Sequence, residues 1–123
     1  MEIFGDLLKQ EFPIDKMIPI AAYNWDDEAS MQDNNTSAFN YRSIIATDTL
    51  SKHSFGRALD INPKLNPYYA YDGEVYPKGA RYDSALPGTL VDGSSAVRTF
   101  TERGWQWLGS RERHQDYQHF EKP

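Results

Sequence analysis

The stretch SKHSFGRALDINP, residues 51–63, organises this chain, because it places a histidine and an aspartate on either side of a glycine. His53 precedes Asp60 by seven positions. Fully extended, such a segment would span roughly 23 Å, whereas two ligands of one zinc ion need donor atoms only about 3 to 3.5 Å apart. If both residues bind one ion, the chain must bend between them, and Gly56 supplies the permissive backbone.

Residues 56–62, GRALDIN, are then predicted to form a strand. Side chains alternate along a strand, so Ala58 and Asp60 share one face while Leu59 and Ile61 share the other. The carboxylate of Asp60 is expected to point into a site beside a small side chain, with a hydrophobic layer behind it. The alternative for Asp60 is a structural one, since an aspartate before Asn-Pro often caps a turn.

A second candidate cluster is DYQHFE, residues 116–121. Residues three apart face opposite sides of a regular strand, so Asp116 and His119 converge only if Asp116 lies on the turn that enters the strand. His119 would then bind the metal, and Asp116 could accept a proton from a water molecule held there. Three protein ligands plus water is the open geometry of catalytic zinc, which lowers the pKa of that water to about 7.

Each histidine taken alone has a plainer interpretation, because most histidines are surface residues or hydrogen-bonded core residues. His114 lies in the polar run SRERHQD and is expected to be exposed, or otherwise to line a substrate cleft.

Composition limits the classes of protein that fit. The chain has 123 residues, the size of one domain, and we expect residues 1–123 to form it. It contains no cysteine, which excludes disulfides and thiolate metal ligands. The net charge is −5 and the basic residues are scattered, which disfavours a nucleic-acid-binding protein.

Targeting signals are not evident. No apolar run of about 18 residues exists, so no membrane span is expected. The first residues, MEIFGDLLKQEF, carry acids where a signal peptide would carry bases. We therefore expect a protein that stays where it is made, leaves by another route, or has lost its signal.

Local patterns predict an α+β domain with a mostly antiparallel sheet flanked by helices, because strands and helices are mixed without a βαβ rhythm. Ile3, Leu7 and Leu8 mark one face of the first helix. Ser94 or Ser95 can cap the second helix, Val97 and Phe100 would face the core, and Gly104 would end it. The acidic segment 26–37, DDEASMQDNNTS, is expected to be a solvated surface loop, with a weak calcium site as the alternative. The predicted elements are helices at 2–11 and 94–104, extended segments at 17–25, 38–45, 56–62 and 117–121, a loop at 26–37, and a hairpin at 66–77 around Asp72-Gly73.

Two motifs carry a family resemblance. SKHSFGRALD fits S-x-H-x-x-G-x-A-x-D, and DYQHF fits a closing [DE]-x-x-H motif. Together they resemble the zinc D-alanyl-D-alanine carboxypeptidase family, which includes VanY-like enzymes and phage L-alanyl-D-glutamate endolysins. NNTSAFNYR, residues 34–42, is similar to the stretch that carries the family's substrate-binding arginine, and VRTFTERGWQW with DYQHFEKP resembles its helix and final strand. The resemblance spans residues 34–122.

The resemblance implies a role for each matching position. The zinc ligands would be His53, Asp60 and His119, on the sheet, and Asp116 would be the general base. It also implies that Arg42 contacts the substrate carboxylate or the polarised carbonyl, and that Ser51 lines the substrate site. The plain alternatives are a surface strand charge for Arg42 and a turn residue for Ser51.

Two departures from the family pattern bear on these roles. Many relatives have glutamate where Asp116 stands, and aspartate is one methylene shorter. Relatives also read Gly-Gly-x-Trp where this chain has LGSR, so Leu108 and Arg111 would reshape one wall of the cleft.

The function that follows is a zinc peptidase acting on peptidoglycan stem peptides, most simply a D-Ala-D-Ala carboxypeptidase. The alternatives are an L-Ala-D-Glu endopeptidase of the phage type and a non-catalytic zinc-containing module that binds the cell wall. We expect action on the wall, in the periplasm or outside the cell, by a monomer whose partners are stem peptides.

Overall fold

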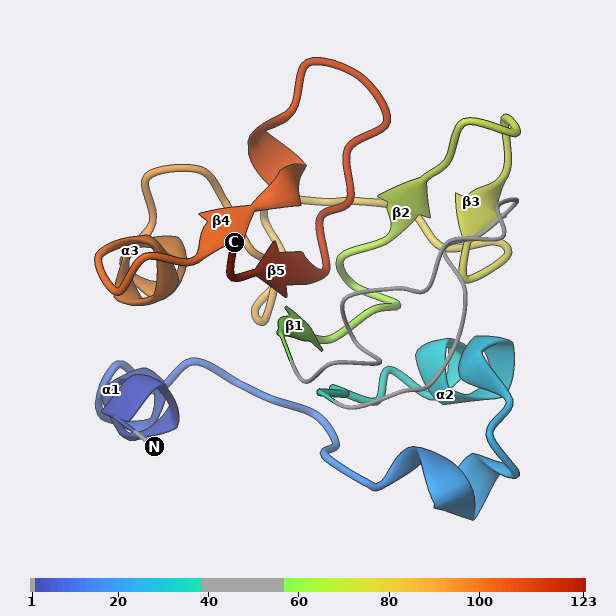
Figure 1. Ribbon diagram of the computed structural model, residues 1–123, viewed down its shortest axis with the longest axis horizontal. Coiled ribbons are helices and arrows are strands. Elements are labelled where there is room, and N and C mark those ends of the chain that lie inside the picture. The colour runs from blue at the N-terminus through green and yellow to red at the C-terminus, as the bar shows by residue number, and fades with distance from the viewer. Residues whose placement is uncertain (1, 39–56) are drawn as a thin grey trace.

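The structure is a computed structural model that describes residues 2–38 and 57–123 (Figure 1). Helices and antiparallel strands are mixed in this part of the chain, which confirms the predicted α+β class. The described helices are α1 (Glu2–Lys9), α2 (Asp27–Gln32) and α3 (Ser95–Thr101), with short 3-10 helices η1 (Ile20–Tyr23) and η3 (Leu108–Ser110). The described strands are β1 (Ala58–Asp60), β2 (Tyr68–Tyr69), β3 (Val75–Tyr76), β4 (Gln106–Trp107) and β5 (His119–Glu121).

The central element is a three-stranded antiparallel sheet in the order β1-β5-β4. One row across it, from Leu59 through Phe120 to Trp107, belongs to the hydrophobic core. The neighbouring rows carry Asp60 opposite His119 and place Glu121 between Ala58 and Gln106. The alternation predicted for residues 58–61 is therefore confirmed, with an apolar layer behind a polar face.

The core lies between this sheet and the helices α1 and α3. Phe100 of α3 stacks on Phe120 with ring centroids 3.9 Å apart, and both side chains are fully buried. Polar contacts join the two helices, since Gln10 donates to Thr99 at 2.8 Å and Arg103 donates to Asp6 at 2.5 Å. Figure 1 places α1 and α3 at one end of the molecule, with α2 and the β2-β3 hairpin at the other.

Helix α3 forms where the sequence predicts it. The Ser94 hydroxyl accepts a hydrogen bond from the backbone N–H of Val97 at 3.4 Å and so caps the first turn. Gly104 follows the last turn with φ +86°, a conformation that glycine adopts without steric cost. In α1, by contrast, Leu7 is buried but Leu8 is 79% exposed, so the expectation for Leu8 is wrong. Successive helical residues are about 100° apart, and Leu8 lies outside the buried stripe.

The segment 26–37 is not only a loop, because it contains helix α2. Asp26 caps this helix by accepting from the backbone N–H of Ala29 at 3.1 Å, and Ser30 and Met31 are buried. Asp33, at the end of α2, pairs with Lys16 and accepts from the Tyr23 hydroxyl at 2.7 Å. Two of the acids expected to be solvated are thus structural partners.

Segment 17–25 departs from the extended conformation expected for it, because η1 forms a turn within it. Asn24, which ends η1, adopts the left-handed conformation with φ +55°. Asparagine tolerates this region better than most residues, and this explains why the turn stops there.

The hairpin predicted around Asp72-Gly73 is confirmed by the pairing of β2 with β3. Asp72 accepts from the backbone N–H of Glu74 at 2.9 Å and from the Tyr76 hydroxyl at 2.6 Å. Gly73 has φ +83°. Of the predicted strand 38–45, only Ala38 lies within the described residues.

Two buried asparagines fix the loop that follows β1. Asn62 donates to the carbonyls of Pro13 at 2.8 Å and Gly88 at 3.1 Å. Asn66 donates to the Gly88 carbonyl at 3.0 Å and accepts from the Leu90 N–H at 2.7 Å. These bonds tie three distant segments together directly behind the end of β1.

None of the helices in the described ranges has the length and apolarity needed to cross a membrane.

Candidate functional site

The centre of the site is a buried pair formed across β1 and β5. Asp60 and His119 are directly opposite in the register, and His119 Nδ1 lies 3.0 Å from Asp60 Oδ1. Asp60 is 3% exposed and His119 is 7% exposed. Two residues separated by 59 positions in the chain therefore meet in one place.

The second nitrogen of the same imidazole contacts another carboxylate. His119 Nε2 lies 2.9 Å from Glu121 Oε1. The two residues are two apart on one strand and so lie on the same face. Glu121 was not among the residues predicted for the site, although this period-two relation in HFE was a usable signal.

The two carboxylates dominate the electrostatics of His119. Burial by itself lowers its pKa, because a charged imidazolium loses hydration. Hydrogen bonds to Asp60 and Glu121, with the charge of Asp116, outweigh burial and raise the pKa of His119 to about 10. The carboxylates of Asp60 and Glu121 therefore place negative charge on both sides of the ring, which favours a cation there.

Asp116 lies on the turn that leads into β5, where the sequence places it. Its backbone N–H donates to the Leu108 carbonyl at 3.2 Å, and its carbonyl accepts from the His119 N–H at 3.2 Å. It also forms an isolated antiparallel bridge with Tyr68. The charge of Asp116 helps to raise the pKa of His119, and its backbone carbonyl contacts the N–H of His119, so the turn holds Asp116 next to the buried pair.

Tyr68 bridges to Asp116, and the charge of Arg111 reaches the Tyr68 hydroxyl. Burial raises the pKa of the Tyr68 hydroxyl and the charge of Asp116 raises it further, while Arg111 lowers it. All three side chains therefore share one electrostatic environment. Arg111 is anchored by donating from Nη2 to the His114 carbonyl at 2.7 Å. The LGSR segment thus contributes a cation beside the site, together with the Leu108 carbonyl that positions Asp116.

His114 is half-buried rather than simply exposed. Its ring lies against Tyr71, with centroids 4.0 Å apart and an interplanar angle of 39°. Its backbone has φ +53°, in the left-handed region. His114 therefore packs on the β2-β3 hairpin and helps to hold the loop that precedes Asp116.

The predicted ligand set is described only in part. Asp60 and His119 are brought together, whereas His53, Arg42 and Ser51 lie outside the described residues. Within residues 2–38 and 57–123, no three His, Asp or Glu side chains form a group that could hold a metal ion. The pair itself fits such a group, because an imidazole nitrogen and a carboxylate oxygen 3.0 Å apart match the separation of about 3 to 3.5 Å between two ligands of one zinc ion.

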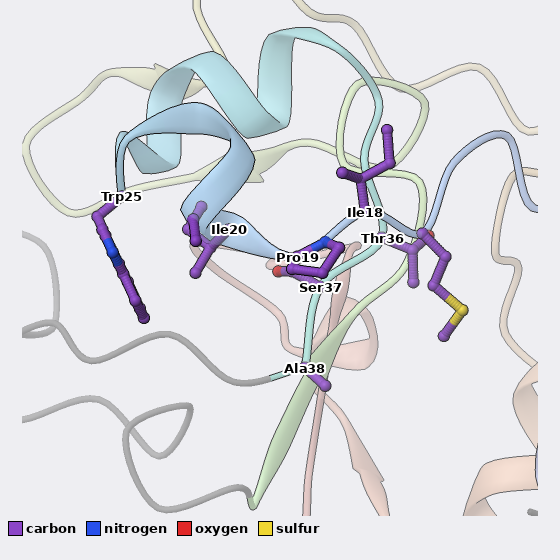
Figure 2. Close-up of a pocket in the computed structure, with 9 residues that line it drawn as sticks. Ile18, Pro19, Ile20, Trp25, Thr36, Ser37 and Ala38 are labelled. Carbon is purple, nitrogen blue, oxygen red and sulfur yellow. The ribbon is translucent and has the colours of Figure 1, made fainter.

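An apolar groove lies on the other side of β1 (Figure 2). Ser37, which lines it, exchanges two backbone hydrogen bonds with Asp60, at 2.9 and 2.8 Å. Trp25, on the opposite wall, is 53% exposed. Strand β1 is thus held at both edges, by residue 37 and by β5. The groove is lined by Met17, Ile18, Pro19, Ile20, Ala21, Trp25, Thr36, Ser37 and Ala38.

Comparison with known proteins gives one match. The model of a family described as D-alanyl-D-alanine carboxypeptidase matches residues 45–122, which include both motifs and the Asp60–His119 pair. Neither the curated proteins nor the solved structures gave a match. Because the matched residues make up more than half of the chain and include the paired strands that form its buried site, the protein belongs to the D-alanyl-D-alanine carboxypeptidase family of peptidases.

Proposed function

We propose that this protein is a zinc-dependent carboxypeptidase that removes the terminal D-alanine from peptidoglycan stem peptides. The observation that carries the proposal is the buried Asp60–His119 pair, with Asp116 at its edge, inside the region matched by the family. Burying a carboxylate and an imidazole is costly unless they are paired or bind a metal. Holding a catalytic metal in a peptidase would account for the burial of this pair.

Asp60 and His119 would hold the metal together with His53. The set of two imidazoles and one carboxylate is a common catalytic zinc set, because it leaves a coordination position open. When bound, zinc would supply a Lewis acid that polarises the scissile carbonyl and makes hydroxide available near neutral pH. Asp60 is held rigidly for this role, since its backbone is hydrogen-bonded to Ser37 and its strand pairs with β5.

Asp116 would move the proton. A carboxylate at the edge of the site can take a proton from the attacking water and pass it to the leaving amine. The turn that carries Asp116 is fixed by its hydrogen bonds to Leu108 and His119, so its carboxylate is positioned before substrate arrives.

Arg42 and Ser51 would bind the substrate. A guanidinium can pair with a terminal carboxylate through two parallel hydrogen bonds, which would select peptides with a free C-terminus. Ser51 would line the same subsite. These two roles are inferred from the family motifs. They concern which peptide would be bound, whereas the roles of Asp60, His119 and Asp116 concern how its bond would be cleaved.

The test is mass spectrometry of purified muropeptides after incubation with the protein, with and without a chelator. Release of free D-alanine that stops with the chelator is the expected result. Cleavage between L-alanine and D-glutamate would replace the carboxypeptidase with an endopeptidase of the same family. Zinc binding without cleavage of any stem peptide would instead indicate a wall-binding module.

A further inference from the structure

We propose that Glu121 is a positioning residue for the metal site, because its carboxylate accepts the Nε2–H of His119 and so leaves Nδ1 as the nitrogen that binds metal. This inference rests on the proposed function, from which it takes Asp60 and His119 as metal ligands. It adds a residue that neither the motifs nor the family match assigns.

The first support is the geometry of the ring. His119 lies between two carboxylates, with Nδ1 3.0 Å from Asp60 Oδ1 and Nε2 2.9 Å from Glu121 Oε1. The two ring nitrogens point in divergent directions, so one ion cannot use both. An ion that also binds Asp60 must lie on the Nδ1 side.

The second support is the chemistry of imidazole. A neutral ring carries one proton and one free lone pair, and only the lone pair can bind a metal. A carboxylate that accepts the proton at one nitrogen fixes the tautomer and ring orientation, and makes the other nitrogen a better ligand. Glu121 is in place to do this, since its side chain is 18% exposed and therefore largely withdrawn from water.

The third support is the scaffold around Glu121. It lies on β5, the central strand of the sheet, between Ala58 of β1 and Gln106 of β4. Ala58 is 1% exposed, and its small side chain leaves room for the longer carboxylate opposite. Residues on the central strand of a packed sheet hold their direction better than loop residues, as a positioning role requires.

A rival role for the same residue is that of a direct ligand. In that case the metal would lie on the Nε2 side, between His119 and Glu121, and Asp60 would be the orienting acceptor. The two roles differ in which ring nitrogen carries the proton after metal is bound. They also differ in whether Glu121→Gln can keep the affinity for metal, since an amide oxygen accepts a hydrogen bond but lacks the charge of a carboxylate ligand.

The experiment compares zinc binding by the parent, Glu121→Ala and Glu121→Gln, measured by competition with a chromophoric chelator, with Glu102→Ala as a control. Glu102 is an exposed glutamate just after α3. Loss of an outer partner of a ligating histidine weakens metal binding by roughly 10- to 100-fold, and we expect that loss for Glu121→Ala. Glu121→Gln should stay much closer to the parent, because its amide oxygen can accept the same hydrogen bond. The control should bind as the parent does.

A second readout is the ¹⁵N NMR spectrum of the zinc-loaded parent, which should show His119 protonated at Nε2 and metal-bound at Nδ1. Metal at Nε2, parental affinity in Glu121→Ala, or an equal loss in Glu121→Gln would each overturn the positioning role. If Glu121→Ala does not fold, the glutamine variant and this spectrum still decide the question. Failure of the parent itself to bind zinc would overturn the proposed metal site instead, so the two failures are distinguishable.

Discussion

At the scale of single residues, the site depends on polar side chains that are buried and pair with one another. Asp60 and His119 have little contact with water, and each satisfies the other across two strands. Removing one partner of such a pair leaves an uncompensated buried group, which costs more than the pair itself contributes. Substitutions at the site therefore need a measurement of folding beside every measurement of activity.

The substitution Asp116→Ala separates binding of metal from turnover. Asp116 lies at the edge of the buried pair and is not among the proposed ligands, so the variant should keep its zinc. Loss of a general base typically lowers the rate by about 10²- to 10⁴-fold, and we expect a loss of this size in D-alanine release. Zinc content and kcat are measured on the same preparation.

Asp92→Ala provides the matched control, because Asp92 is an exposed aspartate in the turn before α3. It should keep both zinc and turnover. Parental turnover in Asp116→Ala would remove Asp116 from the proton transfer, and loss of zinc in that variant would make it a ligand or a structural residue instead.

At the scale of elements, the turn made by η3 depends on a glycine that lies under an aromatic ring. A Cβ at Gly109 would lie 2.2 Å from Cζ2 of Trp107. Trp107 cannot easily move, because it is 5% exposed and its indole N–H donates to the Tyr117 carbonyl at 2.8 Å. We therefore expect Gly109→Ala to cost about 1 to 3 kcal/mol of unfolding free energy through overpacking.

Denaturant unfolding followed by tryptophan fluorescence measures this cost. Gly5→Ala is the control, because a Cβ there has no neighbour within 4 Å and alanine favours a helix. Equal stability of Gly109→Ala and the parent would show that the ring and the turn can separate without loss.

A charged contact ties α2 to the segment before it and predicts a pH dependence. Hydrogen bonds from Lys16 and Tyr23 lower the pKa of Asp33 below its ordinary value. A carboxyl with a lowered folded-state pKa stabilises the fold above its unfolded-state pKa, and this contribution disappears as pH falls through the folded-state pKa. The parent should therefore be more stable than Asp33→Asn at neutral pH, and the difference should shrink in acid.

The measurement is denaturant unfolding of both proteins across a pH series. A difference in unfolding free energy that stays constant from neutral to acidic pH would show that the ion pair does not contribute through the charge of Asp33.

The elements also show what can be predicted from sequence. Strands β1 and β5, the hairpin and α3 carry local signals, which are alternation, Asp72-Gly73 and the Ser94 cap. Helix α2 was missed because its six residues are mostly polar. Its buried side depends on a distant contact through Asn35, whose amide donates both to the Ser30 hydroxyl of α2 and to the carbonyl of Ile18. Strand β4 was missed for a similar reason, since two residues give no period and only the pairing with β5 defines it.

The same distinction, between local sequence signals and contacts that only the fold creates, applies to the site. Asp60, Asp116 and His119 could be selected from sequence because their motifs are specific in spacing and residue type. The contact between Glu121 and His119 has a less specific sequence signal, since a glutamate two positions from a histidine in a strand is common on solvated faces. The placement of His114 against Tyr71 depends on a loop conformation with positive φ, which no local pattern indicated.

At the scale of the whole molecule, bound metal should stabilise the fold, because the proposed ligands come from segments that the unfolded chain keeps apart. Metal at 100 times its dissociation constant adds about 2.7 kcal/mol, which for a domain of this size corresponds to a rise in Tm on the order of 10 °C. Thermal unfolding with added zinc and with a chelator measures the shift.

Asp60→Asn is the control for this effect, because the amide keeps the shape of the side chain but lacks the anionic ligand. Its Tm should not respond to zinc. An equal zinc-dependent shift in Asp60→Asn and the parent would indicate that the ion acts elsewhere on the molecule.

The pairing of β1 with β5 also limits how the length of this chain can change. One residue inserted within 119–121 would turn every later side chain of the strand to the opposite face. With His119 still opposite Asp60, an insertion after it would turn Phe120 out of the apolar layer and Glu121 into that layer. Exposed loop residues such as 83–87 carry no such constraint, and lengthening the chain there costs little. Insertions and deletions that preserve function are therefore expected in the connections, while these two short strands keep their length.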